Sequence, residues 1–515
     1  MQSLQNKRRR AFLTAAVILP IVLALLLSLP MSASSRQAPV KLTILHVNDT
    51  HGHIVPYIEK SINPNHPVSG AEYFAKMVER ARAENPEGTI LLSAGDMFQG
   101  TPISNLFHGR PVIEIMNYLK YDAMVLGNHE FDWGQDVLRT MISEAAFPVL
   151  SANITDRSGK RFDGVQPYVI LKKHNIRVAI IGLTTPEAFY TSKPGNLAGL
   201  SIAQPEKVTP GLIRQVRSKG ADFIVVLSHL GLEADRELAK KVRGIDVIVG
   251  GHSHTVVRDP VNESGTIIVQ AGSNGLYLGE LNVTFDPSRK KILDYTRASE
   301  LRPVSGGPES PFDPDVARIV ESYEVQVRAE FSKVVGKANV NLTRESDKES
   351  AFGDLIADAM REAADAQVAF QNPGGIRTDL SKGPITLEMI YTALPFDNLL
   401  VSMDLSGAQI KELLEKSALS EKVLQVSGLK VEFDTSKPAG SRVISAEIGG
   451  KPLEPTTDYK VATNDFLAAG GDQFNPFKNG KNVSFGVPVR DTVVDYIRRN
   501  SPIDARIRDR IIFVR

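Results

Sequence analysis

Five short stretches of this chain carry the side chains that metal ions prefer as ligands. They are residues 48–53 (NDTHGH), 95–100 (GDMFQG), 127–132 (GNHEFD), 228–231 (SHLG) and 250–254 (GGHSH). Carboxylates, imidazoles and amide oxygens bind borderline divalent cations. Taken alone, an Asp and a His two residues apart also fit a turn in which the Asp bonds backbone N–H groups. Five such clusters in one chain favour a metal site.

The distribution of histidine supports this interpretation. All ten histidines lie between His46 and His254, and the rest of the chain has none. Six of them fall inside the five stretches. Histidines that only fill a core would not avoid the second half of the chain, so the clustering indicates chemistry in the first half.

The five stretches follow apolar runs that are typical of buried strands. These runs cover residues 42–47, 89–93, 123–126, 223–228 and 247–249, with a further run at 178–182. Residues 71–83 carry helical spacing. The alternation predicts a sheet-and-helix domain to about residue 300, and ligands gather at the carboxyl ends of strands in such domains.

The candidate ligands divide into two sets and a shared carboxylate. One cation can be held by Asp49, His51 and His254. A second cation can be held by Asn128, His229 and His252, and Asp96 can bridge the two. The chain has no cysteine, so the ligands are oxygen and nitrogen, which suits Mn, Zn, Co or Fe better than Ca. Two such ions about 3.5–4 Å apart activate a shared water and clamp a phosphoryl group for in-line attack.

His129 is then left without a metal. Asp132 could orient and charge its imidazole. A cationic His129 would stabilise the transferring phosphoryl group or protonate the leaving oxygen. Both roles stay open at this point.

Length and charge limit the number of domains and the class of partner. A chain of 515 residues predicts two or three domains. Lys plus Arg number 60 against 59 for Asp plus Glu, so no basic field favours a nucleic-acid polymer as partner.

The N-terminus predicts export. Residues 7–10 (KRRR) precede a long apolar run and then small residues, as in a signal peptide. The run is nearly long enough to span a bilayer, so residues 1–38 are either a cleaved signal or an N-terminal anchor. We expect a periplasmic or extracellular protein in both cases, with membrane contact only through that anchor.

The second half has a different character. Residues 303–314 are rich in Pro, Gly and Ser, and helical spacing follows them. Beyond residue 335, three stretches stand out: 370–377 (FQNPGGIR), 395–398 (PFDN) and 465–472 (DFLAAGGD). Phe396 and Phe466 lie in loop-like contexts beside polar residues. Two such rings either complete a core edge or sandwich a base.

The five metal-binding stretches, in their order, resemble the calcineurin-like metallophosphoesterase signature, and more narrowly the 5′-nucleotidase / UDP-sugar hydrolase family. The resemblance implies the metal roles given above, with His129 and Asp132 as the catalytic pair. It also implies a four-layer α-β-β-α sandwich over residues 40–305. A linker and bridging helix would cover 306–337, and a separate α+β nucleotide-binding domain would cover 338–515.

The stretches of the second half resemble the nucleoside-binding loops of the same family. On that basis Phe396 and Phe466 clasp the base and Asp472 bonds the ribose hydroxyls. Asn372 would touch the base, and Arg377 would approach the phosphate or ribose. The chain departs from the family pattern at Pro373, in NPGGIR, and at Lys348, where some members have arginine.

The expected activity is hydrolysis of 5′-nucleotides to nucleoside and phosphate by attack of a metal-bound hydroxide. Two alternative activities use the same chemistry: those of a 2′,3′-cyclic nucleotide phosphodiesterase/3′-nucleotidase and of a UDP-sugar hydrolase. A third alternative, from a different class, is a surface binding protein that has lost catalysis.

Overall fold

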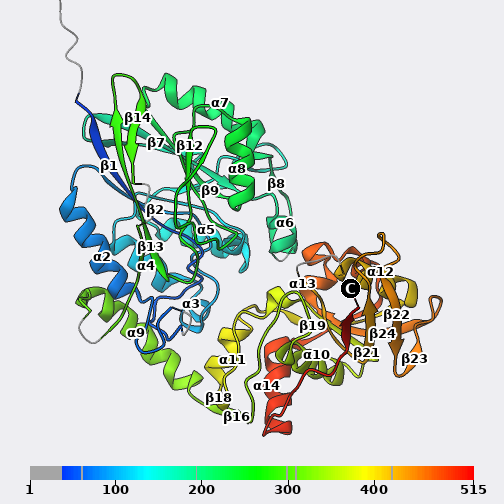
Figure 1. Ribbon diagram of the computed structural model, residues 1–515. Coiled ribbons are helices and arrows are strands. Elements are labelled where there is room, and N and C mark those ends of the chain that lie inside the picture. The colour runs from blue at the N-terminus through cyan, green and yellow to red at the C-terminus, as the bar shows by residue number, and fades with distance from the viewer. Residues whose placement is uncertain are drawn as a thin grey trace, which may run out of the picture.

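The computed structural model describes residues 38–59, 62–192, 194–296, 300–307, 310–418 and 422–514. The predicted signal or anchor lies almost wholly outside these residues. Among the described residues, no helix is both long and apolar enough to cross a bilayer. The chain folds into two α/β domains joined by a helix (Figure 1).

Two sheets form the centre of the N-terminal domain. The first has the order β14-β13-β1-β2-β3-β4, with β15 also paired to β13. Its strands are β1 Val40–Val47, β2 Thr89–Ser93, β3 Ala123–Val125, β4 Val149–Leu150, β13 Tyr277–Asp286, β14 Lys291–Tyr295 and β15 Glu300–Pro303. Strands β1 to β4 are parallel, and β13 is antiparallel to β1.

The second sheet has the order β11-β12-β10-β9-β7-β6. Its strands are β6 Tyr168–Lys173, β7 Ile176–Thr184, β9 Phe223–His229, β10 Val247–Val249, β11 Val261–Glu263 and β12 Thr266–Val269. Strands β7, β9, β10 and β12 are parallel. The short strands β5 (Ile154–Asp156) and β8 (Leu200–Ile202) pair outside both sheets.

The two sheets pack face to face, and helices cover both outer faces. Ile44 and Ile90 of the first sheet meet Ile180 and Val225 of the second in one buried core. The first sheet's outer face is covered by helices α2 Ala71–Glu84, α4 Arg110–Tyr118 and α5 Gln135–Glu144, and the second's by α7 Pro205–Ser218 and α8 Leu232–Lys241. Because both faces of each sheet are buried, the parallel strands read as continuous apolar runs. The predicted four-layer sandwich is confirmed.

Helix α9 (Pro314–Phe331) joins the domains. It begins at the N-cap Asp313, whose side chain accepts hydrogen bonds from the backbone of Asp315 and Val316. It packs on α2, α4 and α3 (Pro102–Leu106) of the first domain and on α11 (Leu387–Ala393) of the second.

The C-terminal domain is built on the mixed sheet β20-β17-β24-β19-β25. The strands are β17 Val368–Gln371, β19 Leu399–Ser406, β20 Gln425–Ser427, β24 Asp458–Asn464 and β25 Lys481–Pro488. Helices α10 (Ala351–Ala363) and α14 (Val489–Asn500) cover one face, and α12 (Gly407–Ser417) covers the other. A second sheet, β23-β22-β21-β26, comprises β21 Leu429–Phe433, β22 Val443–Ile448, β23 Lys451–Pro452 and β26 Ile511–Phe513, and β16 (Val334–Ala338) pairs with β18 (Gly383–Thr386).

Candidate metal centre and substrate cleft

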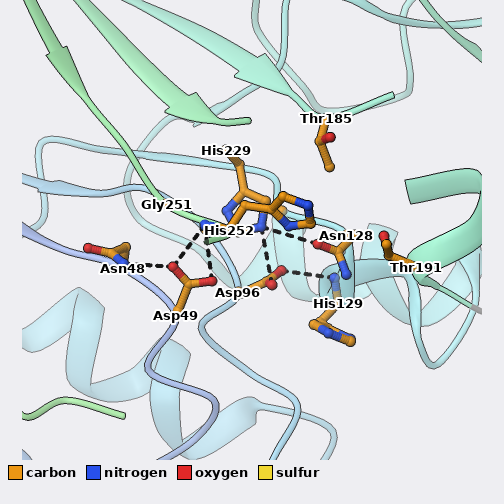
Figure 2. Close-up of polar contacts among 12 residues, drawn as sticks. Asn48, Asp49, Asp96, Asn128, His129, Thr185, Thr191, His229, Gly251 and His252 are labelled. Carbon is orange, nitrogen blue, oxygen red and sulfur yellow. Dashed lines mark hydrogen bonds and ion pairs between the residues drawn. The ribbon is translucent and has the colours of Figure 1, made fainter. Parts of the chain in front are cut away.

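The loops after β1, β2, β3, β9 and β10 converge at one edge of the N-terminal domain (Figure 2). Backbone hydrogen bonds join the first two, because the N–H of Asp49 donates to Gly95 O (2.9 Å) and that of His51 to Asp96 O (3.0 Å). Five predicted ligands have backbone angles φ of 49 to 75°: Asp49, His51, Asp96, His252 and His254. Non-glycine residues rarely adopt this conformation, and it concentrates at functional sites.

Asp49, His51 and His254 form one cluster, whose ligand atoms lie within 4.8 Å of one another. His51 Nδ1 lies 2.9 Å from the carbonyl of Gln99, which can only accept, so Nδ1 carries the proton and Nε2 presents a lone pair. That lone pair faces His254 Nε2 at 3.1 Å, and His254 Nε2 lies 3.3 Å from Asp49 Oδ1. A carboxylate oxygen and two ring nitrogens gathered at one point can together hold a cation.

Asp96, His229 and His252 form the second cluster. His229 Nδ1 lies 2.6 Å from the carbonyl of Ala94, so its Nε2 points at Asp96 Oδ2 (3.1 Å) and Asn128 Oδ1 (3.2 Å). Again the available lone pairs converge, and the donor set fits a borderline divalent ion. The structure thus brings together all seven predicted ligands in two adjacent groups.

The charges of the second cluster favour a cation there. Burial opposes protonation of His229, but the carboxylates of Asp96 and Asp49 outweigh it and raise the pKa of His229 to about 10. A positive charge, carried by a proton or a metal ion, is therefore stabilised at this position. Gly127 permits the close approach, because a Cβ there would collide with Asp96 Oδ1.

His129 and Asp132 lie beside the clusters. His129 Nδ1 is 2.7 Å from Asp132 Oδ2, and the backbone N–H of His129 donates to Asp96 Oδ1 at 2.9 Å. Burial alone would lower the pKa of His129, but the charges of Asp132 and Asp96 raise it above its ordinary value. The imidazole is thus held in one orientation and stabilised as a cation.

A cleft of about 950 Å³ between the domains contains most of the predicted site residues. Its lining from the N-terminal domain includes Asp96, Asn128, His129, Asp132, His252 and His254. Its lining from the C-terminal domain includes Asn372, Arg377, Phe396, Phe466 and Asp472. Residues that were predicted from opposite halves of the chain therefore face one another across a single space.

Arg377 and Phe396 occupy the metal end of the cleft. Arg377 Nη2 lies 3.4 Å from His51 Nε2, and its guanidinium is 5.9 Å from the centre of the Phe396 ring. Burial and the charge of Arg344 lower the pKa of Arg377. Two arginines near the metal clusters form a positive region that suits an anionic substrate.

Asn372, Asp472 and Phe466 form the other end. Asn372 Nδ2 donates to Asp472 Oδ2 at 3.3 Å, and the ring of Phe466 lies directly over Gly471. Phe466 was expected in a loop but lies in the short helix α13 (Asp465–Ala468). The helix forms because the Asn464 side chain caps it by accepting from the Leu467 N–H.

Residues that the sequence analysis missed hold the ligand loops in place. Glu130 is buried and accepts hydrogen bonds from the N–H groups of Asp96, Met97 and Gly127. Its position inside GNHEFD was the only available signal. Gln270 donates to Gly251 O and accepts from Ser253 and Thr255, on either side of the two histidines in GGHSH.

Asn48 and Glu187 were also missed. Asn48 Nδ2 donates to Asp49 Oδ2 at 2.6 Å. Glu187 Oε2 lies 3.0 Å from His252 Nε2, which directs the other ring nitrogen of His252 towards the cluster. Nothing in the sequence around Glu187 marked it.

Comparison with known proteins agrees with this geometry. Residues 42–256 match the calcineurin-like phosphoesterase family, and residues 334–479 match the 5′-nucleotidase C-terminal domain. The chain is 32% identical to snake venom 5′-nucleotidase of Crotalus adamanteus, over 92% of this chain and 89% of the venom protein.

Two further relatives are informative. The trifunctional nucleotide phosphoesterase protein YfkN of Bacillus subtilis (strain 168) is 33% identical over 85% of this chain, which spans only 32% of that longer protein. The crystal structure of a 5′-nucleotidase precursor from Thermus thermophilus is 36% identical, with a TM-score of 0.83 over 92% of this chain and 99% of that one.

Proposed function

Because this chain belongs to the 5′-nucleotidase family and is a metal-dependent phosphoester hydrolase, we propose that it is an exported enzyme that hydrolyses 5′-nucleotides to nucleoside and phosphate. One observation carries the proposal. A single cleft holds Asp96, Asn128 and His252 at one end and Phe466 and Asp472 at the other. A ligand that reaches both ends has a phosphate and a nucleoside.

The two clusters fit two divalent ions. Asp49, His51 and His254 would hold one, Asn128, His229 and His252 the other, and Asp96 would bridge them. When bound, the pair activates a water and withdraws charge from the phosphoryl oxygens. Oxygen and nitrogen ligands leave Mn, Zn, Co and Fe as the candidate metals.

The protein's own groups would complete the reaction. Arg377 is placed to neutralise a phosphate held beside His51, since its guanidinium lies 3.4 Å from that ring. The cationic imidazole of His129, held by Asp132, would stabilise the phosphoryl group as charge develops or donate its Nε2 proton to the leaving 5′-oxygen.

The end of the cleft that the C-terminal domain forms would select the nucleoside. Phe396 and Phe466 offer faces for a base, and every base can stack on an aromatic ring. The carboxylate of Asp472 would accept hydrogen bonds from the ribose hydroxyls. Asn372, which already bonds Asp472 at 3.3 Å, would contact the base.

Export is part of the proposal. The basic and apolar segment at residues 1–38 has the composition of a signal peptide or anchor, and we infer a periplasmic or extracellular location. The N-terminal sequence of the native protein tests this. A chain that begins at Met1 and stays in the soluble cytoplasmic fraction would contradict it.

Activity on other nucleotide phosphoesters is the second candidate. A relative 33% identical to this chain is named a trifunctional nucleotide phosphoesterase. The test is phosphate release from 5′-AMP, 3′-AMP, 2′,3′-cyclic AMP and UDP-glucose, each assayed with Mn, Co, Zn and Fe. We expect 5′-AMP to have the highest kcat/KM. A higher value for any other substrate would favour the second candidate, and no turnover of any nucleotide would contradict both.

A further inference from the structure

The carbonyl group of Pro395 accepts hydrogen bonds from both domains. Asn105, in α3 of the N-terminal domain, donates from Nδ2 to Pro395 O at 2.8 Å. Arg490, in the first turn of α14, donates from Nη1 to the same oxygen at 3.0 Å. In Figure 1, α3 lies beside α11, where the two domains meet. One main-chain oxygen therefore joins side chains from opposite halves of the chain.

Asn105 ties this carbonyl to the loops that carry the candidate metal ligands. Its Oδ1 accepts from the backbone N–H of Gly100 at 3.0 Å, so Nδ2 is the end of the amide that faces Pro395. Gly100 belongs to the same loop as Asp96. A Cβ on Gly100 would collide with the backbone of His51, so the loop also lies directly against a second ligand. The metal-binding loops therefore set the position of Asn105.

Arg490 holds the same part of the chain from the other side. It is buried, and its Nη1 also donates to Leu394 O at 3.2 Å, while Nη2 pairs with Asp397. Its guanidinium carbon lies 4.0 Å from the centre of the Tyr391 ring. A buried guanidinium is stable only with partners of this kind. Arg490 therefore fastens residues 391–398, which we call the substrate segment, to α14.

Two residues of the cleft depend on the substrate segment. Phe396 belongs to it and lines the cleft. Arg377 is attached to it, because its backbone N–H donates to Ala393 O at 2.8 Å. A shift of the segment would therefore move two groups together: the ring offered to the base and the guanidinium offered to the phosphate.

We propose that Asn105 and Arg490 are positioning residues, which together hold the substrate segment in register with the metal centre. The proposal rests on the proposed nucleotidase function. Both residues lie outside the cleft lining, so they act through the segment and do not touch the substrate.

This arrangement has a consequence for substrate choice. A nucleotide spans both ends of the cleft and needs Phe396 at the right distance from the metal centre. An aryl phosphoester such as bis(p-nitrophenyl) phosphate has no nucleoside and needs only the metal end. Loosening the substrate segment should therefore reduce turnover of nucleotides more than turnover of the aryl ester.

Asn105→Asp removes one hydrogen bond of Asn105 and keeps the other. A carboxylate still accepts from the Gly100 N–H, but it cannot donate to Pro395 O. The measured quantity is the kcat/KM for 5′-AMP divided by that for bis(p-nitrophenyl) phosphate. We expect this ratio to fall about five-fold, the effect of losing one hydrogen bond between neutral groups. The fall should come from a higher KM for 5′-AMP, and an unchanged ratio would overturn the proposal.

Asn117→Asp is the matched control. Asn117 of α4 makes the same two kinds of bond, since its Nδ2 donates to Glu144 O at 2.9 Å and its Oδ1 accepts from the Ala146 N–H at 2.7 Å. It belongs to the same domain as Asn105 and does not line the cleft. Its ratio should equal that of the unmodified protein. Equal losses in the two variants would overturn the proposal.

Arg490→Lys tests the other side of the carbonyl. Lysine keeps the positive charge but lacks the planar fork that reaches both Pro395 O and Asp397. We expect the ratio to fall about ten-fold, because bonds made by a charged group contribute more than neutral ones.

Arg510→Lys is the control for this second variant. Arg510 lies in the same domain and bonds Val426 O and Asp358 Oδ2, both at 2.8 Å, so it combines a carbonyl and a carboxylate as Arg490 does. It does not line the cleft, and its ratio should stay unchanged. An equal fall in Arg510→Lys and Arg490→Lys would overturn the role given to Arg490.

Amide hydrogen exchange tests the substrate segment without any substrate. The N–H groups of Arg377 and Val489 donate to carbonyls near the two ends of the segment, at 2.8 and 2.9 Å. Both should exchange faster in Asn105→Asp than in the unmodified protein or in Asn117→Asp, because a less constrained segment opens more often.

The N–H of Leu453, which bonds Ala446 O in the same domain, is the internal reference. It should exchange at the same rate in all three proteins. Unchanged exchange at Arg377 and Val489, or an equal increase at Leu453, would overturn the proposal. Failure of the unmodified protein to hydrolyse 5′-AMP would overturn only the nucleotidase function.

Discussion

The ring of Phe396 lies 5.6 Å from the imidazole of His129, with 34° between the two planes. His129 belongs to the N-terminal domain and Phe396 to the C-terminal domain, so the contact crosses the cleft. A group bound next to Phe396 is therefore also next to the candidate catalytic imidazole. In the proposed function, Phe396 would stack on the base and through this contact also affect how His129 meets the phosphate.

Truncating Phe396 tests this relationship. Phe396→Ala should raise the KM for 5′-AMP about ten-fold, because stacking on an aromatic ring contributes about 1–3 kcal/mol per base. Phe396→Tyr should restore the KM. Phe485→Ala is the control, since Phe485 lies in the same domain and is 63% exposed. An equal rise in KM for bis(p-nitrophenyl) phosphate would show that the variant damages the site as a whole.

The sequence predicted where the strands end, and with them where the candidate metal ligands gather, for one physical reason. Buried parallel strands are apolar on both faces, so their ends are marked where polar residues begin. Strand β10 begins and ends at the predicted residues, Val247–Val249, and helix α2 extends the predicted helix by one residue, to Glu84. The candidate ligands follow those strand ends, so locating the ends also indicated which side chains the fold brings together.

Residues whose role depends on the tertiary fold could not be predicted in this way. Glu130 acts by accepting hydrogen bonds from the N–H groups of Asp96 and Met97. These residues are more than thirty positions away in the sequence, and only the folded sheet brings them within reach. Glu187 reaches His252 across 65 positions of sequence. Phe466 was placed in a loop because a helix of four residues has no periodic pattern to detect.

Substitution of His129 separates its two candidate roles. His129→Ala should lower kcat for 5′-AMP by about 10²–10⁴, the usual contribution of a positioned acid. If His129 protonates the leaving oxygen, p-nitrophenyl phosphate should lose much less, since its leaving group needs no proton. If His129 stabilises the phosphoryl group, both substrates should lose equally. Asp132→Asn should reproduce a weaker form of the same pattern, about 10–100-fold, and metal content should stay unchanged in both variants.

Removal of metal should abolish activity and lower the melting temperature. His51 Nε2 and His254 Nε2 lie 3.1 Å apart in one candidate cluster, where both nitrogens can bind the same cation. A ligand present at about 1,000 times its Kd stabilises the folded state by about 4 kcal/mol.

Elemental analysis should find two metal ions per chain after reconstitution. His254→Ala should retain about one, whereas His66→Ala, an exposed histidine outside both clusters, should retain two. Full metal content in His254→Ala would contradict the assignment.

A buried carboxyl group far from the metal centre should make the stability of the C-terminal domain depend on pH. Asp354 of α10 is 2% exposed and lies 3.6 Å from Arg510 Nε, next to strand β26. Burial raises the pKa of Asp354 from 3.8 to about 8, although the charge of Arg510 opposes the shift. Between these two pH values the folded state keeps a proton that the unfolded state releases. The contribution of Asp354 to the free energy of unfolding should therefore be largest at low pH and fall as pH rises from about 4 to 8.

Replacing this carboxyl with an amide should remove that dependence. Asp354→Asn should show a smaller fall in melting temperature between pH 5 and pH 8 than the unmodified protein, because the amide has no proton to lose in this range. Calorimetry at saturating metal measures the melting temperature of both proteins at each pH. The difference between the two melting temperatures cancels pH effects on metal binding that both proteins share. Asp358→Asn, which removes the other carboxylate bonded to Arg510, controls for loss of the ion pair. If the melting temperatures of Asp354→Asn and of the unmodified protein fall equally between pH 5 and pH 8, Asp354 does not titrate in this range.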